Sequence, residues 1–189
     1  MGETSIRRVC VGMLGTNCYI VSDPERDDCV VIDPGAEPER IRRAMDGKKL
    51  AAILLTHGHF DHIGAVDALM GSDTVLVIHE ADAAMPGDTT LNVSWMIGET
   101  VTAQKPTRTV REGDDLTLAG LTFTVLHTPG HTPGCACYAC GDVLFTGDTV
   151  MGAGCGRTDL PGGDDEAMSR SLARLAPLRA RYTMLGGHG

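Results

Sequence analysis

The feature that most constrains this chain is a six-residue run holding four side chains of metal-binding type, His57-Gly58-His59-Phe60-Asp61-His62. It directly follows the apolar run 51–55, which is typical of a buried strand. Because residues two apart in extended chain point to the same side, His57 and His59 can share one ion. Asp61 and His62 stand where a helix is expected to begin. Imidazole and carboxylate are ligands that suit zinc or iron, so the run predicts a metal site rather than a histidine-rich polar turn.

Three further residues of ligand type follow apolar runs in the same way. With the predicted strands before them, they are His131 after 121–127, Asp148 after 143–146 and His188 after 181–185. If these strands lie side by side, their ligands converge on the carboxyl edge of a sheet, where open sheets commonly bind ligands. Each residue also has an ordinary interpretation, as a turn residue, a helix cap and a tail residue respectively. The repeated placement favours one shared site.

The rest of the chain mixes strands and helices. Further strands are predicted at 6–11, 17–22, 29–32, 75–78 and 135–140. Helices are predicted over 38–45, from about Asp61 to before Gly71, and from a cap at Asp164 to about 176. Residues 86–106 carry little periodicity and are interpreted as a long loop with one helical turn. This mixture suits two sheets with helices packed outside them.

Length and charge exclude several classes of function. The 189 residues fit a single domain, 1–189, with a full hydrophobic core. A net charge of −9 argues against a nucleic-acid partner, because phosphate binding needs a basic face. The chain has no apolar stretch approaching the ~18 residues of a membrane span and no signal-peptide core at its start. Seven cysteines without framework spacing suit free thiols in a reducing cytosol, so a cytoplasmic protein is expected.

Several other side chains that can bind metals have ordinary interpretations. His79 follows a strand and is expected to be packed rather than ligating. Cys135, Cys137 and Cys140 are expected to be buried thiols, the first two on one face of a strand and the third on the other. Cys155 is interpreted as a passive thiol in a glycine-rich loop.

The combined pattern resembles the metallo-β-lactamase superfamily. The residues that carry the resemblance are His57-x-His59-x-Asp61-His62, His131, Asp148 and His188, together with the runs 17–19, 31–35 and 128–134. The resemblance implies an α/β fold, the αββα sandwich of two mixed β-sheets flanked by helices. It also implies two divalent metal ions, zinc by preference with iron or manganese as alternatives. One ion would be held by His57, His59 and His131, the other by Asp61, His62 and His188, with Asp148 bridging them.

Two later runs narrow the resemblance. Residues 145–149 and 156–164 are similar to the single-domain glyoxalase II-like (hydroxyacylglutathione hydrolase-like) branch. This implies a thioesterase that acts on S-D-lactoylglutathione or a similar small thioester, its only expected partner, by attack of a metal-bridging hydroxide. Asp61 would orient that hydroxide as well as bind metal, and a thiol leaving group, with a pKa near ~8.5, needs little protonation. Arg157 is a candidate for binding a substrate carboxylate, with a structural ion pair as the alternative.

Two rival functions stay open. Residues 155–159 also resemble a persulfide dioxygenase of the same superfamily, which would use a single iron and consume oxygen. The second rival is a non-catalytic metal-binding scaffold, although a site that has lost its catalytic role has no need of all seven ligands. The oligomeric state is not predicted.

Overall fold

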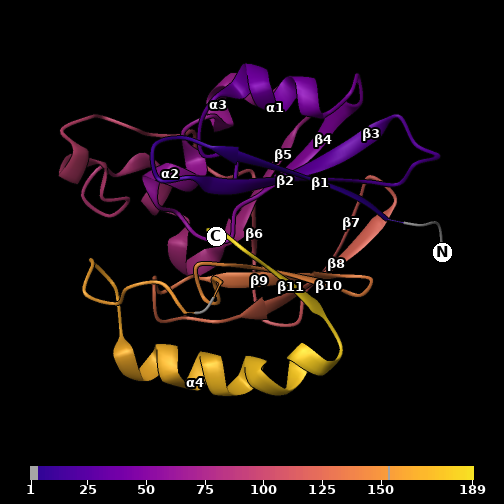
Figure 1. The fold of residues 1–189 in the computed structure, drawn as a ribbon. Helices are drawn as coiled ribbons and strands as arrows, with labels where there is room; N and C mark the ends of the chain where they lie inside the picture. Colours follow the sequence, from indigo (N-terminus) through magenta and orange to yellow (C-terminus); the bar gives the residue numbers. More distant parts are fainter. Residues whose placement is uncertain (1–3, 153) are drawn as a thin grey trace.

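Two β-sheets stack face to face with helices on both outer surfaces (Figure 1), in a computed structural model that describes residues 4–152 and 154–189. The first sheet has the strand order β1-β2-β3-β4-β5-β6. Its strands are β1 (Ser5–Val11), β2 (Thr16–Ser22), β3 (Asp28–Ile32), β4 (Lys49–Leu54), β5 (Val75–His79) and β6 (Arg108–Val110). Strands β1 to β3 pair antiparallel and β3 to β6 pair parallel, so the sheet is mixed.

The second sheet has the order β11-β10-β9-β8-β7. Its strands are β7 (Asp115–Leu118), β8 (Leu121–His127), β9 (Ala136–Cys140), β10 (Val143–Gly147) and β11 (Thr183–Gly186). Only the β10–β11 pair is parallel. The two mixed sheets and their flanking helices confirm the predicted αββα sandwich. The short charged strands β6 and β7 were not predicted, because three or four residues with few apolar side chains carry little periodicity.

The space between the sheets is filled by the alternate side chains of both. Tyr138, Phe123 and Phe145 are fully buried there, and Tyr19 packs its ring edge against Phe145 at 5.2 Å. Burying each such aromatic side chain contributes about 1.5–3 kcal/mol. Cys140 faces this layer, whereas Cys137 faces the opposite side of the sheet, under the C-terminal helix. Both thiols are buried, as predicted.

Helices cover the outer surfaces. The first sheet is covered by α1 (Pro38–Ala44) and α3 (Val66–Leu69), whose Ile41 and Val66 are buried against it, and the second by α4 (Asp165–Leu175). The predicted Pro38 start of α1 is confirmed. The predicted cap of α4 is also confirmed, since the Asp164 carboxylate accepts a hydrogen bond from the Ala167 N–H at 2.8 Å.

The single helix predicted from about Asp61 was wrong. The chain forms two four-residue helices, α2 (Phe60–Ile63) and α3, with a break between them. The Ala65 N–H donates to the Pro34 carbonyl at 2.9 Å instead of continuing the α2 ladder, so a tertiary contact ends the helix. Asp61 and His62 therefore lie on the one turn of α2, in the segment that follows β4.

The segment 86–106 has more structure than predicted. Two 3-10 turns, η2 (Met85–Gly87) and η3 (Ser94–Ile97), replace the single helical turn. The buried Asn92 side chain accepts from the Ser94 N–H at 3.0 Å and donates to the Val101 carbonyl at 2.8 Å. Two more such turns, η1 (Glu80–Asp82) and η4 (Ala176–Ala180), follow β5 and α4. Among the described residues, no helix is long and apolar enough to cross a membrane.

Candidate metal centre

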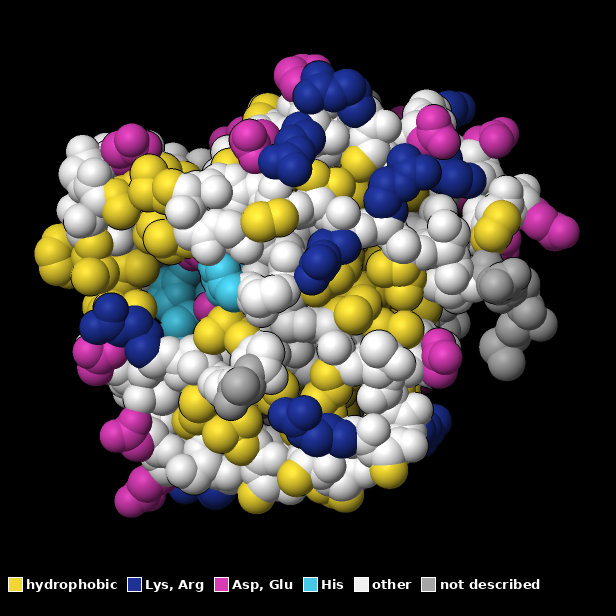
Figure 2. All heavy atoms as spheres, viewed as in Figure 1, with side chains coloured by type: hydrophobic (Ala, Val, Ile, Leu, Met, Phe, Trp, Pro, Cys, Tyr) yellow, Lys and Arg dark blue, Asp and Glu magenta, His cyan; other side chains and the backbone are white. Residues whose placement is uncertain are grey.

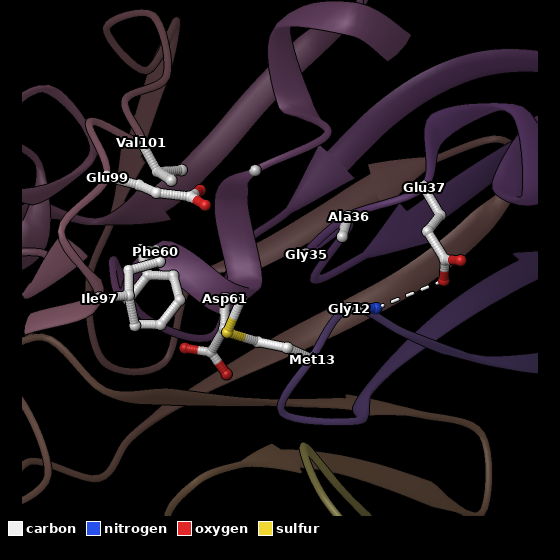
Figure 3. A pocket seen from close by; sticks show the side chains of 11 residues that line it. Gly12, Met13, Gly35, Ala36, Glu37, Phe60, Asp61, Ile97, Glu99 and Val101 are labelled. Atoms are coloured by element: carbon white, nitrogen blue, oxygen red, sulfur yellow. Dashed lines mark hydrogen bonds between the residues drawn. The ribbon is translucent and has the colours of Figure 1, made fainter.

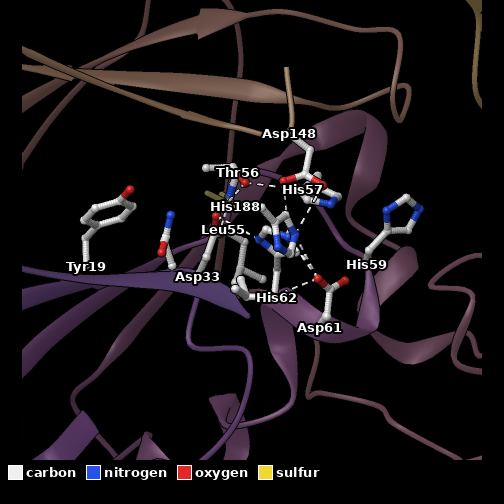
Figure 4. Close-up of polar contacts among 12 residues, drawn as sticks. Tyr19, Asp33, Leu55, Thr56, His57, His59, Asp61, His62, Asp148 and His188 are labelled. Atoms are coloured by element: carbon white, nitrogen blue, oxygen red, sulfur yellow. Dashed lines mark hydrogen bonds and ion pairs between the residues drawn. The ribbon is translucent and has the colours of Figure 1, made fainter. Parts of the chain in front are cut away.

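All seven predicted ligands gather in one place. Figure 4 labels each of them except His131, near the ends of the two sheets. His57 follows β4 of the first sheet, whereas the other three ligand-bearing strand ends belong to β8, β10 and β11 of the second. The strands that precede His131, Asp148 and His188 thus lie in one sheet and end at the same edge, with β10 beside β11 and β8 one strand further. His57 comes from the other sheet, so the face-to-face packing of the two sheets completes the convergence. Residues of ligand type at strand ends identify an edge, but the pairing of strands into sheets depends on long-range contacts.

The first group consists of His57, His59 and His131, whose candidate ligand atoms lie within 4.8 Å of one another. Two of them have an oriented ring. The His57 Nδ1 lies 3.1 Å from the Thr56 hydroxyl oxygen, and the His131 Nδ1 lies 2.6 Å from the Arg157 carbonyl oxygen. We infer that each Nδ1–H donates to that oxygen, which leaves Nε2 free for a cation. His59 is turned differently, with its Nδ1 2.9 Å from the His131 Nε2.

The second group consists of Asp61, His62 and His188 and meets the same 4.8 Å limit. His188 Nδ1 lies 3.1 Å from the Leu14 carbonyl oxygen, and its Nε2 lies 3.2 Å from Asp61 Oδ2. The His62 Nε2 lies 3.4 Å from that same carboxylate oxygen. The Thr16 hydroxyl donates to Asp61 Oδ2 at 2.9 Å and holds the carboxylate in this position.

Asp148 lies between the two groups. Its Oδ2 is 3.5 Å from His131 Nε2 of the first group and 3.6 Å from His188 Nε2 of the second, and its Oδ1 is 3.5 Å from His62 Nε2. A carboxylate in this position can contribute an oxygen to each of two neighbouring cations. Asp148 is therefore a candidate for a ligand shared between the two groups.

Asp33 contacts Thr56 and His62 and appeared in the sequence analysis only within the run 31–35. Its Oδ1 accepts the Thr56 N–H at 2.8 Å, and its Oδ2 accepts the Thr56 hydroxyl at 2.7 Å. The same Oδ2 lies 3.0 Å from His62 Nδ1. One buried carboxylate thus fixes the hydroxyl that orients His57 and the ring of His62. Ligating histidines commonly depend on such outer partners for their orientation.

Two glycines allow the backbone to approach the ligands closely. Gly147 has a φ of 47°, and a Cβ there would lie 2.3 Å from the Thr56 Oγ1. At Gly187 a Cβ would lie 2.3 Å from Asp148 Oδ1 and 2.9 Å from the His62 ring. Both glycines directly precede a proposed ligand, so any side chain at either position would displace the site.

The electrostatics of the first group favour neutral imidazoles. Burial, together with the neighbouring histidines, lowers the pKa of His57 well below its usual value and that of His59 to about 3. Burial also lowers the pKa of His131, against the opposing effect of Asp148. Neutral imidazole is the form that binds a cation, so these three rings are ready to ligate at neutral pH.

The second group behaves in the opposite way. Burial alone would lower the pKa of His62, but the carboxylates of Asp61, Asp148 and Asp33 outweigh it and raise the pKa to about 10. The hydrogen bond with Asp61 raises the pKa of His188. Burial raises the pKa of Asp148, although the nearby histidines oppose this. The carboxylates of this group therefore surround a position that attracts positive charge.

The donor atoms fit a pair of divalent cations. Five buried side-chain atoms of the described ligands have no hydrogen-bond partner: His57 Nε2, His59 Nε2, His62 Nδ1, His62 Nε2 and Asp148 Oδ1. An unsatisfied buried polar group costs about 1–3 kcal/mol, so such a cluster needs a compensating ligand. Five imidazoles and two carboxylates form a mixed nitrogen and oxygen donor set, which suits zinc, iron or manganese.

The site opens into a cavity of about 400 Å³ that is lined by His59, Asp61, His131, Asp148 and His188 on its inner side. Arg157 also lines it, and its guanidinium forms two hydrogen bonds of 2.6 Å with the Asp159 carboxylate. His79, which was predicted to be packed, stacks at 4.0 Å on the His127 ring, and it belongs to neither ligand group. Cys155 is exposed.

Comparison with known proteins agrees with this geometry. The family model described as the metallo-beta-lactamase superfamily matches residues 11–188. The chain is 37% identical to the probable metallo-hydrolase YqgX of Bacillus subtilis, over 97% of this chain and 89% of that protein. It is 35% identical to the hydroxyacylglutathione hydrolase GloC of Haemophilus influenzae, over 92% of this chain and 85% of that protein.

Two solved structures have nearly the same fold over almost the full chain. The BLEG-1 B3 metallo-beta-lactamase has a TM-score of 0.92 and 34% identity, covering 98% of this chain and 92% of its own. TTHA1623, solved in a di-iron-bound form, has a TM-score of 0.86 and 37% identity, covering 97% of this chain and 92% of its own.

Proposed function

The chain belongs to the metallo-β-lactamase superfamily of metal-dependent hydrolases, and we propose that it hydrolyses a small thioester. S-D-lactoylglutathione is the first substrate to test, because the relative GloC is named a hydroxyacylglutathione hydrolase and matches most of the chain. The proposed ligands are His57, His59 and His131 for one cation and Asp61, His62 and His188 for the other, with Asp148 shared. Zinc is the proposed metal, and the di-iron form of TTHA1623 makes iron the first alternative.

The observation that carries this proposal is the set of buried donor atoms without partners in the two ligand groups. Around them, His57 and His131 turn their Nδ1 atoms outward to fixed oxygens, so that Nε2 faces the centre. A scaffold that only stabilised the fold would not need this many buried, unsatisfied groups, since apolar side chains would cost less.

Two divalent cations held at this position would supply hydroxide from water at neutral pH and an electrophile for the substrate oxygen. The chain's own residues would then orient the reacting groups and exclude bulk water from them. Asp61, whose carboxylate is fixed by Thr16, would orient that hydroxide toward the acyl carbon. A thiol leaves as thiolate because its pKa is near ~8.5, so no protein group has to protonate it. The reaction adds water across the acyl carbon–sulfur bond and yields an acid and a thiol.

The decisive test combines metal analysis with activity on one preparation. About two metal ions per chain, with turnover of S-D-lactoylglutathione or of an uncharged thioester, would support the proposal. The assay should include a chromogenic cephalosporin, because BLEG-1 is a β-lactamase. β-Lactam cleavage without thioester cleavage would contradict it. A single iron, with oxygen consumed alongside glutathione persulfide and no thioester turnover, would instead favour the dioxygenase. Bound metal without any turnover would favour the scaffold.

A further inference from the structure

The mouth of the metal centre is apolar. Six apolar side chains line the 400 Å³ cavity beside the ligands, and we call them the apolar rim: Leu14, Val93, Met96, Ile97, Met151 and Leu160. They come from three separate segments, namely the β1–β2 turn, the η3 turn and the loop after β10. Figure 2 shows hydrophobic side chains bordering the cyan histidines in the hollow of this face.

Part of the apolar rim is unusually exposed. Leu14 is 53% exposed and Met96 is 48% exposed, whereas the hydrophobic side chains of both sheets are almost entirely buried. Large apolar side chains that stay exposed around a concave site commonly mark a place where a ligand covers them. Three segments contribute apolar side chains to this one opening, and two of them, the β1–β2 turn and the η3 turn, contribute exposed ones.

A second cavity of about 250 Å³ adjoins the first and shares Phe60, Asp61 and Ile97 with it (Figure 3). Its charged lining residues besides Asp61 are Glu37 and Glu99. The space available to a substrate beside the metal centre is therefore apolar on one side and acidic on the other.

Positive charge is scarce at this opening. Among the described residues, Arg157 is the one lysine or arginine that lines either cavity. Its guanidinium already makes a bidentate pair with Asp159, which a substrate carboxylate would have to displace. A glutathione thioester carries two carboxylates on its thiol half, and neither cavity offers an unpaired cation for them.

Given the proposed thioester hydrolysis, on which this inference rests, we infer that the apolar rim binds an uncharged, apolar arm of the substrate. The preferred substrates are then thioesters whose acyl or thiol half is a hydrocarbon chain without carboxylates. A fully buried methylene contributes about fourfold in affinity, and half of that free energy, on a rim that stays half exposed, corresponds to about twofold per methylene.

The test separates binding from catalysis. Binding of non-hydrolysable thioethers to the metal-loaded protein is measured by calorimetry, with S-methyl, S-butyl and S-hexyl derivatives of N-acetylcysteamine and of glutathione. In parallel, kcat/KM is measured for acetyl, butanoyl and hexanoyl thioesters of the same two thiols. We expect affinity and kcat/KM to rise about twofold per methylene, and N-acetylcysteamine compounds to exceed their glutathione counterparts.

Variants assign the effect to the apolar rim. Met96→Ser and Leu160→Ser should each flatten the dependence on chain length in both assays. Trp95→Ser is the matched control, because Trp95 is 58% exposed on the same η3 turn as Met96 but lines neither cavity. It should leave the slope unchanged.

The outcomes distinguish the two proposals. Thioester cleavage without any dependence on chain length, or with a preference for glutathione compounds, would refute substrate binding at the apolar rim. It would still support the proposed thioester hydrolysis. Chain-length-dependent binding of the thioethers, with no thioester cleaved, would support the rim and refute the thioesterase. If Trp95→Ser and Met96→Ser reduced the dependence on chain length equally, substrate binding at the apolar rim would also be refuted. The effect would then not come from the residues that line the cavity.

Discussion

Asp82 connects the two loops that carry the first ligand group, and its replacement should weaken metal binding without removing a ligand. The residue is fully buried at the end of η1. Its Oδ1 accepts the Gly134 N–H at 2.6 Å, and its Oδ2 accepts the Thr132 hydroxyl at 2.7 Å and the Gly58 N–H at 3.3 Å. Gly58 lies between His57 and His59, and Thr132 directly follows His131, so one carboxylate sets the distance between the two loops.

The expected loss of stability follows from these three hydrogen bonds. Asp82→Ala leaves three buried donors without an acceptor, and we expect it to lower the free energy of unfolding by about 3–5 kcal/mol. Asp82→Asn keeps the shape and one carbonyl oxygen, which can still accept the Gly134 N–H. Its amide can donate to the Thr132 hydroxyl but opposes the Gly58 N–H, so about 1–3 kcal/mol should be lost. Loss of an outer partner of this kind typically lowers metal affinity about 10- to 100-fold.

The assay is competition for zinc against a chromophoric chelator, with urea unfolding of the metal-free protein measured in parallel. Asp67→Asn is the matched control, because Asp67 is exposed and its carboxylate accepts only the Gln104 N–H, at 2.8 Å, which belongs to neither ligand loop. It should leave zinc affinity unchanged. If Asp82→Asn bound zinc as tightly as the unaltered protein while losing stability, Asp82 would support the core alone and the reasoning about the two loops would fail.

Three further predictions concern the same site and its surroundings. His59→Ala and Asp148→Ala should each abolish thioester hydrolysis while the far-ultraviolet circular dichroism stays native; full activity of metal-replete His59→Ala would contradict the ligand assignment. Metal removal should lower the thermal midpoint, because a ligand at 1,000 times its Kd stabilises by about 4 kcal/mol, or about 8–16 °C for a domain of this size; an unchanged midpoint after chelation would argue against bound cations. Burial and the neighbouring His127 lower the pKa of His79 to about 4. The unfolded chain therefore takes up a proton at His79 below about pH 6.5 that the folded protein does not, and stability falls with pH. His79→Gln should reduce this fall by up to about 2 kcal/mol between pH 7.5 and 5 in urea unfolding of the metal-free protein, and an equal fall in both proteins would refute it.

The ligands themselves were accessible from the sequence because their signal is local. His57, His59 and Asp61 stand close together after an apolar run, and each later ligand follows a strand by a short turn. The helix that ends after Ile63 was mispredicted for the opposite reason. Its continuation is blocked by the hydrogen bond from Ala65 to Pro34, two residues far apart along the chain.

The outer partners of the site could not be predicted, because they act across long separations. Asp82 is 50 residues from Thr132 in sequence, and Asp33 is 23 residues from Thr56. Neither carboxylate lies in the run 57–62. The pairing of β3 with β4 brings Asp33 to Thr56, and the packing of the two sheets brings Asp82 to Thr132. Side chains that bind a cation can thus be recognised by type and spacing, whereas those that hold them in place are defined by the fold. It follows that substitutions at Asp33 or Asp82 should lower metal affinity, although neither side chain lines the cavity.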